Sequence, residues 1–388
     1  MKDAYSHQFV HSIEQIGRDT WQACAAFASP LCQYSFLHAI EASGSVGANT
    51  GWSPSHLIIF QHKRPVAILP LYKKTHSYGE YVFDFAWANT YRQYGLNYYP
   101  KLICAIPFTP VTGPRILSVR QDLSAIVAYA CKILDEKLIA EGLSSMHWLF
   151  VDNPLSELLQ AQQQLMRLSV QFQWYNRNYT SFDEFLLGLN ARKRKSIRAE
   201  RRKVDNQGIV IKRMHGAAIM ADDMDFFYQC YQQTYLKRSG HQGYLNQAFF
   251  TQLLSSMSDN LLLVLAYRDN CPLAGALFLY DQHQLNGRYW GAIEDIDQLH
   301  FECCYYQGIE FCIEQNISCF NPGTQGEHKI LRGFEPTYCY SNHHLKELAF
   351  HDAVSRFIDS ETPEIQAYKQ DADKLLPFRK SSGEESDD

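Results

Sequence analysis

Two stretches of the chain repeat one alternation of apolar and polar positions. The stretches LIIFQHKRPVAILPLY and VLAYRDNCPLAGALFLY each predict an apolar strand, a polar turn with a proline, and a second apolar strand. Pro65 aligns with Pro272, and Ala67 aligns with Ala274 at the same offset. Internal similarity of this kind indicates two copies of one supersecondary unit.

Each predicted hairpin is followed by an amphipathic helix and a further strand. In the first copy we expect the helix over residues 122–141 and the strand in MHWLFV, which begins at Met146. In the second copy we expect the helix over residues 299–315 and the strand in ISCF, which begins at Ile317. Strands that alternate with helices predict an α/β (α+β) fold in which each copy is a mixed sheet flanked by helices.

A chain of 388 residues is long enough for two such domains. We place an N-terminal domain at residues 1–165, a C-terminal domain at residues 166–372 and a disordered acidic tail, ending in KSSGEESDD, at residues 373–388. The first domain carries an insert, residues 75–113, that is rich in Tyr, Phe, Trp, Pro and Gly. Such an insert is either a wall of a substrate cleft or a loop that packs its own aromatic side chains.

Composition narrows the class of protein. The formal net charge is −5, so the chain as a whole is no binder of polyanions. Eleven cysteines without a CxxC pair, no signal peptide and no apolar run of membrane-spanning length predict a cytoplasmic protein with free thiols and no membrane span. Zinc-ligand spacing, a P-loop, a dinucleotide-binding glycine fingerprint and a GxSxG elbow are all missing, so we expect no metal site.

The most basic stretch, ARKRKSIRAERRKV at residues 191–204, predicts a helix with two cationic faces. Arg194 and Arg198 lie on one face, and Lys195 lies on the other. We expect these three side chains to hold the phosphates of a nucleotide, of coenzyme A or of an RNA backbone. The alternative is a solvated helix face whose cations pair with acids elsewhere in the chain.

The segment NPGTQGEHKILRGF follows the last predicted strand, where ligands bind in α/β sheets. Glu327 can accept a proton, and His328 can shuttle one near neutral pH. Lys329 and Arg332 can hold an anionic group, and Gln325 can contact the substrate. The alternative is a capped turn in which His328 and Arg332 make structural hydrogen bonds.

Two further stretches supply candidate site residues. The strand motif GRYWG places Arg288, Tyr289 and Trp290 between glycines that permit a bulge, and we expect these residues to contact the substrate. In the helical stretch LHFECCYYQGIEFCIEQ, Glu302 and Tyr305 are candidates for polar catalytic work. The cysteines of this stretch fall on an apolar stripe and are expected to be core residues.

Together these motifs resemble a group of bacterial proteins described as FemAB-like, or as GNAT-superfamily acyltransferases linked to peptidoglycan. The resemblance spans about residues 36–378, and it is carried by YGEYVFDFAWANTYRQYGLNYYPKLICAIPFTPVTGPR, RKRKSIRAERRKV, GRYWGA, LHFECCYYQGIEFCI and PGTQGEHKILRGFEP. It implies two tandem GNAT-like domains, in agreement with the internal repeat. The basic helix resembles the K/R-x-x-I-R helix of the second domain of Fem-type ligases, but the long helical arm of some Fem ligases and the Q/R-x-x-G-x-G/A pyrophosphate loop are missing.

The resemblance implies transfer of an acyl or aminoacyl group from a co-substrate, acyl-CoA or aminoacyl-tRNA, to an amine on a small molecule, a peptide or a peptidoglycan precursor. No permanently bound cofactor is expected. A neutral amine would attack the carbonyl directly, with Glu327 or His328 as base and with Lys195, Arg198 and Lys329 on phosphates. The alternatives are a GNAT-fold binding module without chemistry, which recognises a cell-wall precursor or peptide, and an RNA-binding protein that uses the basic helix.

Overall fold

Both copies of the sequence repeat form β-hairpins with the same turn. In the first hairpin the turn residues His62 and Lys63 have φ angles of 50° and 63°. In the second, Asp269 and Asn270 have φ angles of 52° and 63°. Positive φ at both central positions belongs to the tight turn whose twist matches that of the flanking strands.

The two hairpins also share a β-bulge. Val66 in the first hairpin and Leu273 in the second are each skipped by the pairing register, one residue after the aligned prolines Pro65 and Pro272. An extra residue at the same place in both copies kinks both strands in the same way. The repeat predicted from the sequence is therefore confirmed down to its local irregularity.

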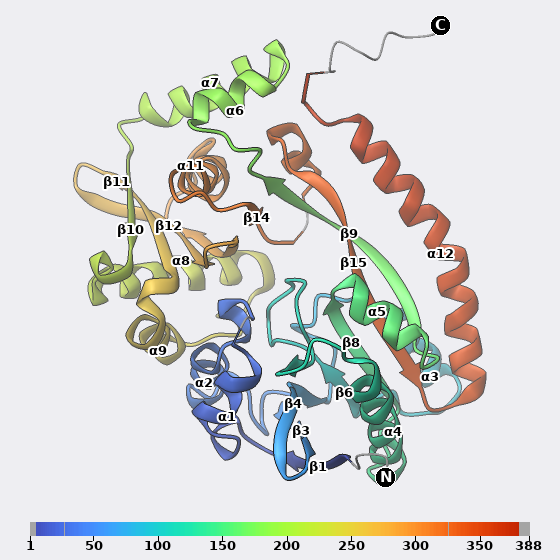
Figure 1. Cartoon of the computed structure of the whole chain (residues 1–388). Coiled ribbons are helices and arrows are strands. Elements are labelled where there is room, and N and C mark those ends of the chain that lie inside the picture. Colours follow the sequence, from blue (N-terminus) through green and yellow to red (C-terminus); the bar gives the residue numbers. More distant parts are fainter. Residues whose placement is uncertain (1–4, 27, 325, 380–388) are drawn as a thin grey trace, which may run out of the picture. The chain divides into compact units, whose positions relative to one another are not determined.

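The computed structural model describes residues 5–26, 28–324 and 326–379 (Figure 1). They form two compact units, each drawn from three segments. Unit 1 takes residues 1–169, 244–256 and 338–366, and unit 2 takes residues 170–243, 257–337 and 367–388. The division made from the sequence at residue 165 assigns residues 244–256 and 338–366 to the second domain, whereas in the structure they pack with unit 1.

Unit 1 contains a four-stranded sheet of order β1-β3-β4-β7 and a second sheet in which the order is β15-β8-β6-β5-β2. Its strands are β1 (Tyr5–Val10), β2 (Trp52–Pro54), β3 (His56–Gln61), β4 (Arg64–Leu69), β5 (Leu71–Lys74), β6 (Lys101–Cys104), β7 (Leu117–Ser118), β8 (Ser145–Val151) and the larger part of β15 (Glu335–Leu345). Its helices are α1 (Arg18–Cys24), α2 (Tyr34–Ala42), α3 (Phe85–Gln93), α4 (Ser124–Ala140), α5 (Asn153–Gln160), most of α9 (Gln247–Met257) and the first part of α12 (Leu348–Lys374).

Unit 2 contains one sheet of order β10-β11-β12-β13-β14-β9. Its strands are β10 (Val210–His215), β11 (Leu261–Arg268), β12 (Cys271–Tyr280), β13 (Gln284–Ala292), β14 (Cys319–Asn321) and the second half of β9 (Leu165–Tyr175). Its helices are α6 (Phe182–Gly188), α7 (Ala191–Asp205), α8 (Ala221–Ser239), α10 (Leu299–Phe301), the π-helix η5 (Glu302–Tyr306), α11 (Gln307–Glu314), the 3-10 helix η6 (Glu327–Arg332) and the end of α12.

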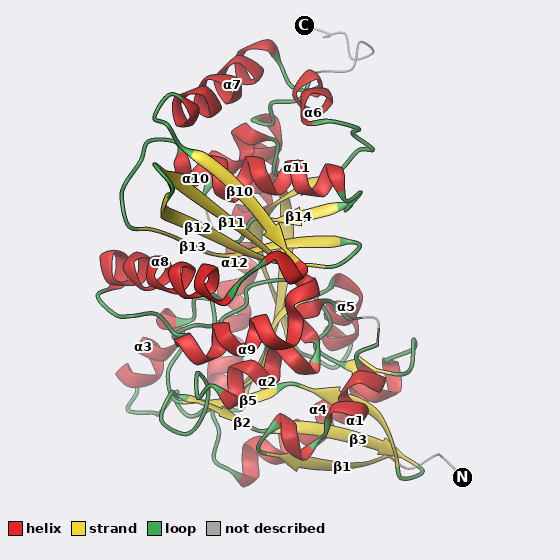
Figure 2. Ribbon diagram, turned by 90° about the vertical axis from the view of Figure 1, so that its left-hand side faces the viewer, coloured by secondary structure: helices red, strands yellow, loops and turns green. Residues whose placement is uncertain are grey.

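Helices cover both faces of the unit 2 sheet, and glycines allow them to approach closely. A Cβ atom on Gly291 of β13 would lie 1.9 Å from the carbonyl oxygen of Cys230 in α8. On the other face, a Cβ atom on Gly308 of α11 would lie 2.6 Å from the ring of Phe320. Figure 2 shows α8 and α11 on opposite sides of these strands. The predicted architecture, mixed sheets flanked by helices, is confirmed.

A proline distinguishes the two copies of the hairpin. In unit 2 the second hairpin strand, β12, runs unbroken over ten residues. In unit 1 the matching stretch is broken at Pro70 into β4 and β5. Proline has no N–H to donate to a sheet, so it marks the place where the chain passes from the first sheet of unit 1 to the second.

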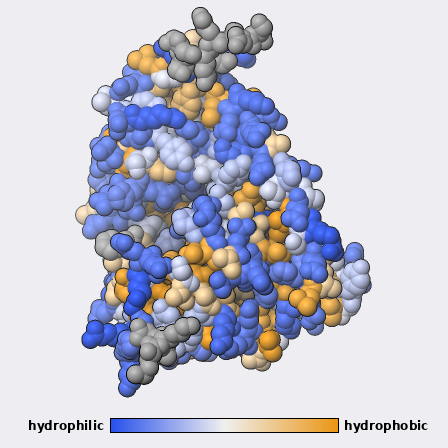
Figure 3. Space-filling view, turned by 45° about the vertical axis from the view of Figure 1, so that its right-hand side comes forward, coloured by the Kyte–Doolittle hydropathy of each residue, from blue (hydrophilic) through white to orange (hydrophobic). Residues whose placement is uncertain are grey.

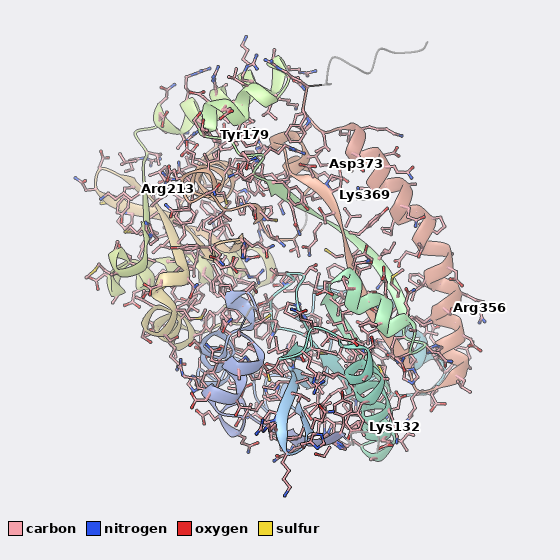
Figure 4. The ribbon with its side chains drawn as sticks, viewed as in Figure 1. Lys132, Tyr179, Arg213, Arg356, Lys369 and Asp373 are labelled. Carbon is pink, nitrogen blue, oxygen red and sulfur yellow. The ribbon has the colours of Figure 1, made fainter. Side chains whose placement is uncertain are left out.

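The C-terminal helix is longer than the sequence predicted. We expected a disordered tail from residue 373, but α12 continues to Lys374, with Lys369 and Asp373 paired at 2.8 Å one turn apart (Figure 4). Beyond it, Leu376 and Phe378 pack against the core of unit 2. These two apolar side chains anchor residues 375–379, a signal that the acidic composition of the following residues masked in the sequence. Residues 380–388 lie outside the described residues.

The aromatic insert, residues 75–113, packs part of its side chains as a local core. Trp87 and Tyr91 of α3 pack with Tyr98 and with residues of β15 and α12. Other side chains of the insert are exposed, above all Tyr78 and Tyr94. On the face shown in Figure 3, apolar residues are interspersed among polar ones. Among the described residues, no helix is long and apolar enough to cross a membrane.

A buried cluster of charges, which no sequence pattern predicted, holds the start of the insert. Lys101 of β6 is fully buried and donates to Ser77 Oγ at 2.9 Å, to Glu80 Oε2 at 2.7 Å and to Asp84 Oδ2. All three acceptors come from the segment that leads into α3. Three acceptors for one ammonium group are what a buried lysine needs in order to stay charged.

The charges of this cluster support one another. Burial alone would lower the pKa of Lys101, but Glu80 and Asp84 raise it above the ordinary value. Burial alone would raise the pKa of Asp84, but Lys101 holds it well below the usual range. Lys101 is strongly coupled to both carboxylates, and without it Glu80 would rely on Lys74 at 3.9 Å and Asp84 on the Tyr98 hydroxyl group at 2.6 Å.

We therefore expect Lys101→Met to lower the free energy of unfolding of unit 1 by about 3–5 kcal/mol, because two carboxylates lose their counter-ion while they remain buried. Chemical denaturation followed by fluorescence measures the change. The matched control is Lys132→Met on α4 (Figure 4), whose ammonium group is exposed and lies 3.9 Å from Glu136. Equal stability of the two variants would contradict the role given to the buried cluster.

Candidate functional site

The site is built where two parallel strands of unit 2 separate. β13 pairs with β14 only over Gln284–Asn286 and Cys319–Asn321. β13 then continues to Ala292, while the segment after β14 turns away through Pro322 and Gly323. Ligands in α/β sheets bind at such a carboxyl end. The segment that leaves it is the one whose acid, base and glycine content drew attention in the sequence.

A bulge in β13 directs the GRYWG motif to two faces of the sheet. Leu277 pairs with Tyr289 and Phe278 with Gly287, so Arg288 is the extra residue. Tyr289 is buried, with its ring 5.6 Å from that of Tyr231 in α8. Of the three predicted substrate contacts, Trp290 lies near the other candidate residues, Tyr289 faces away from them, and Arg288 packs beside the ring of Tyr289 at 5.3 Å.

A π-turn brings two side chains of the following helix together. The helix passes through five π-helical residues, Glu302–Tyr306, between α10 and α11. With this wider turn His300 and Tyr305, five positions apart, stand with their rings 5.3 Å apart and nearly perpendicular. Trp290 lies 5.4 Å from His300 on the other side.

The predicted acid–base residue His328 joins this group. Tyr305 Oη and His328 Nε2 are 2.8 Å apart, a hydrogen bond between the helix and η6. His328 is exposed whereas Tyr305 is 3% exposed, so the imidazole is the member of the pair that solvent reaches. The structure therefore brings together Tyr305, His328 and Trp290 from the sequence prediction and adds His300, which the sequence placed only beside the core cysteines.

Both histidines of the site are shifted toward the neutral form. Burial, with smaller contributions from neighbouring basic groups such as His328 and Arg238, lowers the pKa of His300 to about 3. Burial, Arg332 and Lys329 also lower the pKa of His328 below its ordinary value of 6.5. A neutral imidazole can accept a proton at neutral pH, which a general base requires.

Lys329 does not have the role predicted for it. We expected its ammonium group to hold a phosphate, but the side chain is 1% exposed and donates to the carbonyl oxygens of Gly323 at 2.7 Å and Thr324 at 3.1 Å. Burial lowers its pKa to about 7. Lys329 therefore stabilises the turn that follows β14, because its side chain points into the protein and bonds to two carbonyl oxygens of that turn.

Arg332 is also committed to the protein. Its guanidinium donates to Tyr306 Oη at 2.9 Å, to Glu200 Oε2 at 2.8 Å and to the His328 carbonyl at 2.8 Å. It lies 3.5 Å over the ring of Phe301. The prediction that Arg332 binds an anionic ligand is corrected, since its donors are used by the contacts that fix η6 against α7.

The two predicted acidic residues are likewise engaged. Glu302 is 4% exposed and is held by Arg201 at 2.9 and 3.1 Å and by Gln307 at 2.7 Å, so it is part of a buried ion pair rather than a free catalytic acid. Glu327 is exposed and accepts a hydrogen bond from Tyr368 Oη at 3.0 Å. Gln325, the predicted substrate contact, lies outside the described residues.

The basic run forms the predicted helix, α7, but its cations differ in use. Asn190 caps it by accepting from the Lys193 N–H at 3.0 Å. Arg194 donates to the Leu189 carbonyl at 3.3 Å, and Arg198 pairs with Asp183 at 2.8 Å. Lys195 is exposed.

Residues on the inner face of α7, Ile197 and Val204, are buried. On the same helix Arg201 binds Glu302, and Glu200 binds Arg332. α7 is therefore tied directly to the helix and to the turn that carry Tyr305 and His328. One side of the basic helix stabilises the site, and the other side remains available to a ligand.

The equivalent place in unit 1 is filled by the protein itself. There β6 and β8 form the parallel pair, and at its end Arg115, 1% exposed, donates to the carbonyl oxygens of Leu149 at 2.8 Å and Val111 at 2.7 Å. Further bonds go to the carbonyl oxygens of Gly113 and Pro114. The candidate site thus belongs to unit 2.

Metal and thiol chemistry find no support in the described residues. No group of three His, Cys, Asp or Glu side chains there could hold a metal ion. All cysteines are free, and all but Cys271 and Cys319 are buried. Burial raises the pKa of Cys303 and Cys304 far above the ordinary value, so both remain protonated core residues, as predicted.

The sequence profile of the FemAB-like family, described as peptidoglycan biosynthesis/recognition, matches residues 12–380. No curated protein matches the chain. Among solved structures, FemX is 11% identical, with 90% of this chain and 100% of that chain covered, at a TM-score of 0.51. A conserved protein of unknown function from Bacteroides thetaiotaomicron is 13% identical, with 87% and 99% covered, at a TM-score of 0.52.

A tandem GNAT protein from the clavulanic acid biosynthesis pathway, without AcCoA, is 11% identical, with 88% and 99% covered, at a TM-score of 0.46. At such low identity these likenesses concern the fold. The predicted α/β fold class, two units that are each a mixed sheet flanked by helices, is confirmed, and the fold is similar to that of FemX.

The burial of Lys329 makes stability depend on pH. Between its folded pKa of about 7 and the ordinary lysine value of 10.5, the unfolded chain binds more protons at this residue than the folded chain does. Stability attributable to Lys329 therefore rises with pH across this window. We expect the free energy of unfolding to rise less steeply between pH 7 and about pH 9 in Lys329→Met than in the natural protein.

Urea denaturation at both pH values measures the two slopes. Lys374→Met in the same unit, which removes an exposed ammonium group paired with Asp371 at 2.8 Å, is the control and should keep the natural slope. If Lys329→Met also keeps that slope, Lys329 is not a buried amine of lowered pKa.

Proposed function

Because the chain belongs to the FemAB-like family, we propose that it is a transferase that moves an acyl or aminoacyl group from an activated donor to an amine. The donor is acyl-CoA or aminoacyl-tRNA, and the acceptor is a peptide or a peptidoglycan precursor. One observation carries the proposal: the hydrogen-bonded pair Tyr305–His328 joins the helix that follows β13 to the 3-10 helix that follows β14, the two strands that separate after Asn286 and Asn321.

The reaction needs an amine with a free lone pair. The nitrogen forms a bond to the carbonyl carbon, the ester or thioester bond breaks, and the amine loses a proton. Tyr305 Oη, 2.8 Å from His328 Nε2, takes that proton and passes its own to the imidazole. The leaving hydroxyl or thiol takes up a proton in turn, so no covalent enzyme intermediate is required.

The surroundings favour His328 as the base. Because burial and two neighbouring cations lower its pKa, the imidazole is neutral at physiological pH and free to accept. Glu327, the other residue considered, is exposed and already accepts from Tyr368. The ring of His300 packs against that of Tyr305, and Trp290 packs in turn against His300, which restricts the orientation of the tyrosine side chain.

The phosphates of the donor bind to basic side chains of α7 rather than to the turn between β13 and α10. That turn carries Glu294, Asp295 and Asp297, which are exposed and pair with Arg268, Lys237 and Lys203, so these ion pairs leave no excess positive charge for a pyrophosphate. The outer face of α7 exposes Arg192, Lys195 and Arg202. This arrangement supports a donor whose phosphates lie along α7, and it favours aminoacyl-tRNA over acyl-CoA.

We expect His328→Ala and Tyr305→Phe each to lower kcat for acyl transfer about 10²-fold or more, since general acid–base catalysis contributes on the order of 10²–10⁴. In the natural protein, kcat/KM should rise with pH to a plateau with a midpoint below 6.5, where His328 loses its proton. Transfer of labelled amino acid or acyl group to an amine measures both.

Glu327→Gln is the matched control and should leave kcat within about threefold of the natural value, because an exposed carboxylate on a tyrosine hydroxyl contributes little. Full activity after replacement of Glu327 and His328 together would exclude both residues as the base.

Binding of the donor is the first measurement to make. We expect the natural protein to bind either a CoA ester or a charged tRNA saturably in calorimetry, with affinity reduced about tenfold or more in the double variant Lys195→Ala, Arg198→Ala. Arg356→Ala, an exposed arginine on α12 in unit 1 (Figure 4), is the control for loss of charge alone. If the protein binds neither donor, the alternative hypothesis of a binding module without catalytic activity is favoured.

A further inference from the structure

Two asparagines form the last residue pair before β13 and β14 separate. Asn286 of β13 lies opposite Asn321 of β14 in the parallel register. Paired residues of neighbouring strands point to the same face of a sheet. Asn286 is 0% exposed and Asn321 is 1% exposed, so two amide groups are buried side by side in strands that are otherwise apolar.

These amides are short of hydrogen bonds. Within the part of the chain that the structure describes, neither Nδ2 nor Oδ1 of Asn286 has a partner, and Nδ2 of Asn321 has none. Only Asn321 Oδ1 is used, by the Gly323 N–H at 2.9 Å. Buried polar groups in native proteins are nearly always paired, so three open atoms at one place call for a binding partner.

The neighbouring residues fix the direction of the two amides. Leu285 and Phe320, the preceding residues of the two strands, both face Gly308 of α11, so the asparagines point to the other face. The open groups comprise two N–H₂ donors and one carbonyl acceptor.

We propose that Asn286 and Asn321 are catalytic residues that align the two reactants of the transfer, an inference that rests on the proposed function. The Nδ2 groups of both residues donate to the carbonyl oxygen of the acyl donor. Oδ1 of Asn286 accepts one N–H of the attacking amine, which turns the nitrogen lone pair toward the carbonyl carbon. The two reactants together satisfy all three open atoms.

This arrangement acts on the transition state. As the nitrogen–carbon bond forms, negative charge moves to the carbonyl oxygen, and the two donors stabilise it. When the ester or thioester bond breaks, the electron pair returns to the carbonyl, and the amine proton leaves through the base. Neutral amides suit this task because a carboxylate at the same place would keep the amine protonated.

The test compares stability with activity. Leucine is close in shape to asparagine and needs no hydrogen bonds, so Asn286→Leu and Asn321→Leu should keep or raise the Tm, because each removes an unpaired buried amide. Both variants should lower kcat by about 10²–10³-fold, the usual loss for one transition-state donor. Asn286→Asp keeps the acceptor, loses the donor, and should lose kcat as well.

A buried asparagine in unit 1 is the matched control. Asn342 is 0% exposed, accepts from Ser156 Oγ at 2.9 Å and donates to the Ser156 carbonyl at 3.3 Å. Asn342→Leu should therefore lower the Tm and leave the kcat of the remaining folded protein unchanged. This control shows what the substitution does to an asparagine with a structural role.

The outcomes separate the two proposals. If the natural protein transfers a group and the leucine variants keep its kcat, the asparagine assignment is wrong while the proposed function stands. If the leucine variants lower the Tm as Asn342→Leu does, the amides are structural and the assignment again fails. If the natural protein transfers no acyl or aminoacyl group to any amine, the proposed function itself falls, whatever the Tm values are.

Discussion

The pairing of β13 with β14 lasts for three residue pairs, and the organisation of unit 2 follows from its end. Up to Asn286 and Asn321 the strands satisfy each other's backbone groups. Beyond them, β13 is supported by the bulge at Arg288 and by the close approach of α8 at Gly291. The segment after β14 is supported by a turn and by η6. A sheet that stopped pairing without these supports would leave backbone groups buried and unbonded.

Long basic side chains supply that support. Lys329 holds the turn after β14 through two carbonyl oxygens, and Arg332 joins η6 to α7 through Glu200. Arg201 joins α7 to the π-helical segment through Glu302. Each is a long side chain whose charged end bonds to backbone or carboxylate inside the protein, and together they hold Tyr305 and His328 at hydrogen-bond distance on separate elements.

The sequence predicted the elements well and the use of charged side chains poorly, and the reasons differ. The hairpin repeat, the helix after it and the basic helix follow from local apolar patterns and spacing, which survive folding. The sequence does not show whether a charged residue such as Lys329 faces solvent or a buried partner. The partner of Glu302 lies about 100 residues away in the sequence, and that of Arg332 lies further away still. The π-turn has no sequence signal, and Asn286 is visible only as a polar residue within an apolar strand.

The repeat means that the chain carries two descendants of one unit, and Arg115 records how they diverged. Its guanidinium occupies the end of the parallel pair in unit 1 and bonds to four carbonyl oxygens there. Removal of this side chain would not restore a binding place, because the carbonyls would be left without donors in a closed interior. One side chain therefore holds this end of the parallel pair together in the first copy, whereas the second copy has its candidate site at the corresponding end.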